Sequence, residues 1–109
     1  MIFTGTTHAG RWHEDYRDAV ALVESGECSV EAIQLLGAAL VDRPDAGRMA
    51  RTIAVRTIDY LPYLQLARAY QHCGADRLSR QYSQLARMHG VATEEEILTV
   101  ESDLISDSN

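Results

Sequence analysis

Two stretches of this chain carry the same pattern of small and bulky apolar residues, 48 positions apart. The matched pairs are Ala19 with Ala67, Leu22 with Tyr70, and Gly26 with Gly74. In each stretch the apolar residues recur every three or four positions, which is the period of an α-helix. Each stretch closes on a glycine, a residue that commonly ends a helix. The spacing therefore predicts two copies of a helix–turn–helix unit.

The first unit is expected over residues 12–44. The apolar face of its first helix consists of Trp12, Tyr16, Ala19, Val20 and Val23. The turn after Gly26 is short, and Ser29 is a suitable N-cap for the second helix. That helix has an apolar face of Ile33, Leu36, Ala39 and Leu40, and it ends at Asp42, Arg43 and Pro44. Two helices joined by so short a turn must pack antiparallel.

The second unit is expected over residues 62–90. Pro62 falls in the first turn of its first helix, where a missing N–H costs little. The second helix takes Asp76 as its N-cap and ends at Gly90. Its apolar face consists of Leu78, Tyr82 and Leu85, with Ala86 or Met88 as a further member.

These two units resemble the tetratricopeptide repeat. The second copy carries the residues Leu66, Ala67, Tyr70, Gly74, Tyr82 and Ala86 at the positions of that motif. The first copy carries Ala19, Leu22, Gly26, Ala32, Leu36, Ala39 and Pro44. Both copies depart from the family pattern, with Asp18 in place of an apolar residue, one extra residue after Gly26, and Ser79 in place of alanine. The resemblance implies an all-α fold of stacked antiparallel helix hairpins, a fragment of an α-solenoid formed by two divergent repeats.

The segments around the repeats have their own patterns. Residues 1–10 are rich in threonine and glycine and are expected to form a flexible arm ahead of a helical domain at 11–90. For the inter-repeat segment 45–61 we expect a helical start from Asp45 that becomes irregular near Asp59; a continuous, proline-kinked helix from Asp45 to Cys73 is the alternative. The β-branched residues between Thr52 and Ile58 weaken both helical interpretations. Residues 50–70 are also similar to bacterial repeat proteins that enter a repeat through a Tyr-x-Pro-Tyr-type sequence.

The last segment, 91–109, is expected to be an acidic capping helix and tail. Thr93 and Glu96 form a capping-box pattern, and a stripe follows at Ile97, Leu98, Val100, Leu104 and Ile105. Stacked hairpins leave the apolar side of the last unit open, so a terminal helix is needed to cover it. The final "SDSN" should fray.

Charge and composition exclude several classes of function. The formal net charge of −6 belongs to residues 91–109, which carry six acids and no base, whereas residues 1–90 balance ten acids with ten arginines. Without a basic surface, no nucleic-acid partner is expected. No apolar run is long enough to span a membrane, and no secretory signal pattern is present. A cytoplasmic location is expected, with Cys28 and Cys73 both reduced.

No pattern of catalytic or metal-binding residues stands out. His72, Cys73 and Cys28 suggest a zinc site, but no Cys-x-x-Cys or His-x-x-x-His spacing accompanies them. Nothing in the sequence places a base against the Cys73 thiol in the fold, and the Glu94–Glu96 run matches the acidic first turn of a helix. Tyr70, Tyr82 and Trp12 are expected in the core; Tyr60 and Tyr63 remain open between core and surface. No phosphate loop or nucleophile elbow occurs, so we expect neither an enzyme nor a cofactor or metal.

The resemblance implies a concave groove lined by the first helix of each unit. Its exposed positions would be His13, Tyr16, Val20, Val23, Leu61, Leu64, Arg68, Gln71 and His72. This set is apolar with one cation, so the expected partner is a protein or peptide segment that is amphipathic and carries an acidic group. The lysine-and-asparagine pattern that binds a terminal carboxylate in some relatives is absent. We therefore expect a non-catalytic interaction module, an adaptor, scaffold or chaperone-like protein.

Two alternatives follow from the same pattern. Two repeats bury little surface by themselves, so the chain could self-assemble through apolar faces into a homo-oligomer. The acidic tail could instead regulate binding, by occupying the groove or by meeting the arginines at 48, 51 and 56.

Overall fold

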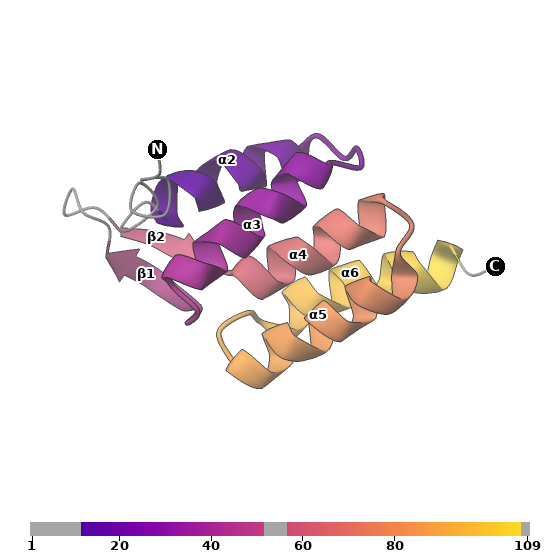
Figure 1. The fold of residues 1–109 in the computed structure, drawn as a ribbon. Coiled ribbons are helices and arrows are strands. Elements are labelled where there is room, and N and C mark those ends of the chain that lie inside the picture. The colour runs from indigo at the N-terminus through magenta and orange to yellow at the C-terminus, as the bar shows by residue number, and fades with distance from the viewer. Residues whose placement is uncertain (1–11, 52–56, 108–109) are drawn as a thin grey trace.

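A computed structural model of the protein describes residues 12–51 and 57–107 (Figure 1). These ranges are mostly helical, which confirms the expected all-α class. The elements are, in order, α2 (Trp12–Glu24), α3 (Val30–Asp42), β1 (Gly47–Arg51), β2 (Thr57–Tyr60), α4 (Pro62–His72), α5 (Asp76–His89) and α6 (Glu94–Asp107). The expected arm at 1–10 lies outside the described residues.

The helix ends follow local chemistry. The Ser29 side chain accepts a hydrogen bond from the Ala32 backbone N–H at 3.1 Å and caps α3 as expected. Pro62 begins α4. The turns after α2, α4 and α5 all require a positive φ, which glycine supplies at Gly26, Gly74 and Gly90. One expectation was wrong: the N-cap of α5 is Ala75, and Asp76 lies inside the first turn, where its charge complements the helix dipole.

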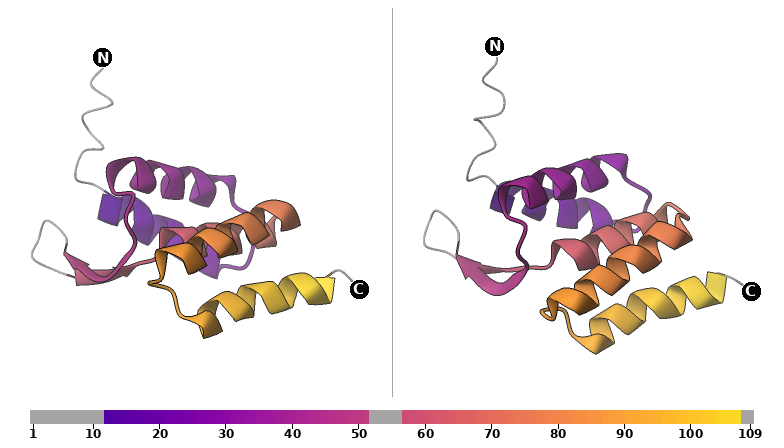
Figure 2. Two further views of the ribbon diagram at one scale, coloured as in Figure 1. Left: turned by 90° about the horizontal axis from the view of Figure 1, so that it is seen from below. Right: turned by 60° about the horizontal axis from the view of Figure 1, so that its bottom comes forward.

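Helix α4 lies at the centre of the molecule. The helices pack in pairs, α2 with α3 and α4 with α5, and α4 also contacts α2, α3 and α6 (Figures 1 and 2). Its buried residues are Pro62, Leu64, Gln65, Leu66, Ala67 and Ala69. Because neighbours cover α4 on several sides, buried side chains surround most of the helix rather than forming one stripe.

A disulfide joins the two helix pairs, so the expectation of two reduced cysteines was wrong. Cys28 follows α2 and Cys73 ends α4; they are 45 positions apart in sequence, yet their Cα atoms lie 4.5 Å apart. Both cysteines stand where one helix gives way to the next, and the fold brings these two turns to the same end of the molecule. The repeat spacing places both cysteines at corresponding turns of the two units, but it does not predict the bond between them.

The inter-repeat segment is a β-hairpin, which contradicts both helical interpretations of residues 45–61. β1 pairs antiparallel with β2, with Gly47 opposite Tyr60 and Arg51 opposite Thr57, and the register shifts between Gly47 and Ala50. Of the β-branched residues that lowered the helix propensity, Thr57 and Ile58 lie in β2, where they favour extended backbone. Two short strands are sufficient here because the base of the hairpin is anchored to the helices.

That anchor is Tyr60, which is completely buried. Its ring centroid lies 4.7 Å from that of Trp12 and 5.1 Å from that of Tyr16. Its hydroxyl donates to the Arg43 carbonyl oxygen at 2.6 Å, and the Arg43 guanidinium lies 4.7 Å above the Trp12 ring. Trp12 thus has the packing role expected for it, and Tyr60, left open by the sequence, belongs to the core.

The face that α5 buries differs from the expected one. Its buried residues are Ser79, Ser83 and Ala86. Leu78 is exposed, Met88 is 78% exposed, and Tyr82 is half-buried with its ring stacked on that of Tyr70 at 5.5 Å. Small residues allow α5 to approach α4 closely enough for the Ser79 hydroxyl to donate to the Ala67 carbonyl oxygen at 2.8 Å.

Helix α6 packs on α4 and α5. The capping box is confirmed: the Thr93 N–H donates to Glu96, and the Glu96 N–H donates to the Thr93 hydroxyl. Ile97 and Val100 are buried, whereas Leu98, expected in the same stripe, is exposed. Within the described ranges α6 contacts neither strand nor α2. The side chains at 48, 51 and 56 lie outside the described residues, so the expected meeting of the acidic tail with these arginines stays a prediction.

Candidate functional site

The candidate site is an open depression of about 370 Å³ beside α2. Helix α2 turns Trp12, Tyr16, Ala19 and Val23 into the core. The neighbouring face of the same helix is open to solvent. The residues that line the depression are Tyr16, Arg17, Val20, Ala21 and Glu24 from α2 and Asp59 from β2. Its floor is therefore apolar, and charged side chains of both signs surround it.

Tyr16 connects this depression to the core beneath it. Its hydroxyl oxygen accepts a hydrogen bond from the Leu61 backbone N–H at 3.1 Å. Burial raises the pKa of Tyr16; the Leu61 hydrogen bond, a second from the Gln65 side chain and the charge of Arg68 offset part of that rise. The phenol therefore stays neutral at physiological pH and serves as a fixed polar group, not as a base.

Helix α4 contributes two residues that act on Tyr16 and do not line the depression. Gln65 is buried, with 7% of its surface exposed, and its Oε1 has no hydrogen-bond partner. Arg68 follows one turn later and is half-buried, close enough for its charge to act on Tyr16. Arg68 is not among the residues that line the depression.

The nine predicted groove positions separate into distinct environments. Tyr16 and Val20 line the depression, although Tyr16 exposes only 7% of its surface. Val23, Leu61 and Leu64 were expected to be exposed and are buried. The reason is the period of the helix: the predicted set on α2 alternated between the core face and the adjacent open face. On α4, neighbouring elements cover the first turns, a packing that the repeat pattern does not disclose.

The remaining predicted positions are partly accessible but do not line the depression. His13, Gln71 and His72 are half-buried. The His13 ring packs edge-on to Trp12 at 5.7 Å, and its Nε2 lies 4.0 Å from the Glu14 carboxylate.

Sequence reasoning missed Arg17, Ala21, Glu24 and Asp59. Arg17, Ala21 and Glu24 follow one another at four and three positions, so a helical wheel centred next to the apolar face would have found them. Asp59 could not have been found in this way, because its place depends on the β-hairpin.

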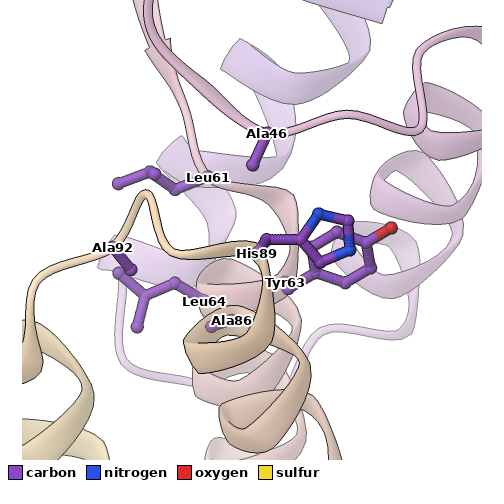
Figure 3. Close-up of a pocket in the computed structure, with 7 residues that line it drawn as sticks. All are labelled: Ala46, Leu61, Tyr63, Leu64, Ala86, His89 and Ala92. Atoms are coloured by element: carbon purple, nitrogen blue, oxygen red, sulfur yellow. The ribbon is translucent and has the colours of Figure 1, made fainter.

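A second pocket is lined by Ala46, Leu61, Tyr63, Leu64, Ala86, His89 and Ala92 (Figure 3). Its volume is about 10 Å³, close to the space that one water molecule occupies. The Tyr63 ring stacks on His89 at 4.2 Å between centroids (Figure 3). This pocket is too small for a ligand.

The chemistry of metals and thiols gives no candidate in the described part of the chain. No group of three or more histidine, cysteine or acidic side chains comes together there. Both cysteines form the disulfide, so neither the zinc site nor the Cys73 nucleophile considered from the sequence has a thiolate available. None of the helices within the described ranges has the length and apolarity needed to cross a membrane.

Comparisons with protein-family models, with curated proteins and with solved structures found no match for this chain.

Proposed function

We propose that the protein is a non-catalytic interaction module that binds a peptide segment or a helix of a partner protein in the depression beside α2. The observation that carries this proposal is the open depression beside α2, in which the half-buried Val20 and the exposed Ala21 lie next to the exposed Arg17. Binding sites for peptides commonly combine an apolar surface with a few charged groups that set orientation.

The proposed architecture is a pair of tetratricopeptide-like repeats closed by α6. In its support, Ala19 and Ala67 are both completely buried at corresponding positions of α2 and α4. The buried residues of α3 and α5 correspond as well: Ala32 with Ser79, Leu36 with Ser83, and Ala39 with Ala86. In such a stack the first helix of each pair faces the concave side, which is where Val20 and Arg68 would lie.

The chemistry of the partner follows from the two halves of the site. An apolar side chain of the partner would cover Val20 and Ala21. An acidic group of the partner would meet Arg68, or Arg17, whose side chain is 72% exposed and lies 3.8 Å from Asp18 in a pair too open to hold it strongly. An amphipathic segment with a carboxylate therefore fits best.

The disulfide bears on where such a module would work. Disulfides persist in oxidising compartments and are rare in the cytoplasm. We therefore favour an oxidising compartment over the cytoplasmic location expected from the sequence. Alkylation of free thiols in the protein isolated from its native host, followed by mass spectrometry, tests this: modified Cys28 and Cys73 would contradict it.

A display library of random peptides tests the binding function. We expect enrichment of peptides that pair an apolar side chain with a nearby acid, and their addition should shift the amide NMR signals of residues 16–24 and of Arg68. Val20→Glu should abolish binding of the enriched peptides, because it places a charge on the apolar floor. Arg80→Glu, on the exposed side of α5, is the matched control and should bind them normally. Absence of enrichment, or equal binding to Val20→Glu, contradicts the proposal.

A further inference from the structure

The outer face of α3 carries an exposed row of uncharged residues that the proposed peptide site does not use. The row consists of Val30, Gln34, Gly37 and Val41, all of them exposed. Val30 is 64% and Val41 is 89% exposed, although both are aliphatic. In both views of Figure 2, α3 lies along the upper edge of the molecule, with no other described element above it.

The corresponding helix of the second pair shows what a solvated face looks like in this fold. The buried residues of α3 and α5 match one another at a constant offset. At the same offset, the outer row of α5 reads Arg77, Gln81, Gln84 and Met88. Three of these four are polar, whereas α3 has two valines and a glycine. The outer face of α3 thus lacks the polar character of the corresponding face of α5.

Gly37 is unexplained by the fold of a single chain. A glycine in the middle of a helix lowers its stability relative to alanine. At Gly37 an added Cβ would meet no atom within 4 Å, so nothing inside the molecule requires the missing side chain. A glycine on an open helix face permits the close approach of another helix.

The row has the same spacing when it is read from either end. Its members follow one another at four, three and four positions. When two copies of such a helix pack antiparallel about a two-fold axis, the first member faces the last, and the second faces the third. Val30 then packs on Val41 of the second copy, and Gln34 covers Gly37 of the second copy. A self-complementary surface of this kind is what a two-fold symmetric contact requires.

We propose that α3 is the contact surface of a homodimer, in which the α3 helices of two copies pack antiparallel through Val30, Gln34, Gly37 and Val41. The flanking Ile33 and Leu40 are half-buried and extend the apolar surface on one side of the row. The contact is a single helix pair, and interfaces of that small size dissociate readily. The dimer therefore forms reversibly with concentration, and it leaves the depression beside α2 free.

Sedimentation of the oxidised protein over a concentration series tests the proposal. The wild type should pass from monomer to dimer. Val30→Glu alone and Val41→Arg alone should each remain monomeric, since each buries an unpaired charge in the contact. Met88→Arg, at the corresponding position of α5, is the control and should dimerise as the wild type does.

The register is tested by mixing the two single variants in equal amounts. In the antiparallel arrangement the new acid of one variant meets the new base of the other, while the remaining pair is still Val30 on Val41. The mixture should therefore form a heterodimer that neither variant forms alone. A wild type that is monomeric at about 1 mM, association that survives both single variants, or a mixture that stays monomeric overturns the proposal. Unchanged helical circular dichroism of the variants shows that folding is intact.

Discussion

The hydroxyls of Tyr60 and Tyr63 donate hydrogen bonds to the backbone carbonyls of two consecutive residues, Arg43 and Pro44. The two tyrosines differ in how deeply they are buried. Tyr60 donates to Arg43 at 2.6 Å from a completely buried position. Tyr63 donates to Pro44 at 3.0 Å in an exposed bond. An unpaired buried acceptor is costly, whereas water replaces a lost exposed bond. The same chemical group therefore contributes unequally to stability.

Tyr60→Phe should lower the free energy of unfolding by about 1–2 kcal/mol, because it leaves the Arg43 carbonyl without its donor. Tyr63→Phe, the matched control, should change it by less than about 0.5 kcal/mol. Urea unfolding followed by circular dichroism measures both. Equal effects of the two substitutions would mean that the Tyr60 hydrogen bond does not stabilise the hairpin base.

At the scale of elements, an arginine joins α6 to α5. Arg87 donates to Glu94 at 2.7 Å and to Glu101 at 3.1 Å, while Ile97 and Val100 pack beneath. The Arg87 hydrogen bonds lower the pKa of Glu94. A lowered pKa means that the contribution of Glu94 to stability is present above the ordinary glutamate pKa and is lost as the pH falls through the lowered value.

Arg87→Gln should therefore increase hydrogen exchange of the α6 amides at neutral pH, with little change in α2 and α3. In the wild type the same loss of protection should appear as the pH falls below the ordinary glutamate range. Arg80→Gln, an exposed residue of the same helix, should leave α6 protected. High salt should reduce the protection of the α6 amides in the wild type, because the ion pairs of Arg87 with Glu94 and Glu101 are partly exposed. If α6 keeps its protection in Arg87→Gln, its apolar contacts alone hold it.

The elements were predictable to different degrees. Helices α2 and α3 followed from spacing, and α6 followed from its capping box, because these signals are local. The hairpin at 47–60 was missed since β-branched residues only disfavour a helix, and the partner strand is not local. The face of α5 was misassigned because Ser79 and Ser83 are polar by composition, yet their small size decides the packing against α4. The groove positions Leu61 and Leu64 were wrongly predicted to be exposed, because neighbouring elements bury them and the local sequence does not show those neighbours.

For the molecule as a whole, the disulfide closes a loop of 45 positions between the two helix pairs. The chain-entropy relation assigns such a loop about 4 kcal/mol, and measured values for native disulfides are about 2–5 kcal/mol. Cys28→Ser combined with Cys73→Ser should lower the free energy of unfolding by that range, measured by urea denaturation. A reductant should destabilise the wild type comparably and leave the double variant unaffected. If the reductant also destabilised the double variant, its effect on the wild type could not be assigned to the disulfide.

The same bond makes the protein tolerant of a broken backbone. A single protease cut anywhere between Cys28 and Cys73 leaves two fragments that remain covalently attached through their cysteines. The two pieces would migrate together on a non-reducing gel and separate only after reduction. Since α4 and α5 would still be tethered to α2 and α3, the cleaved molecule can retain the packing of its helices.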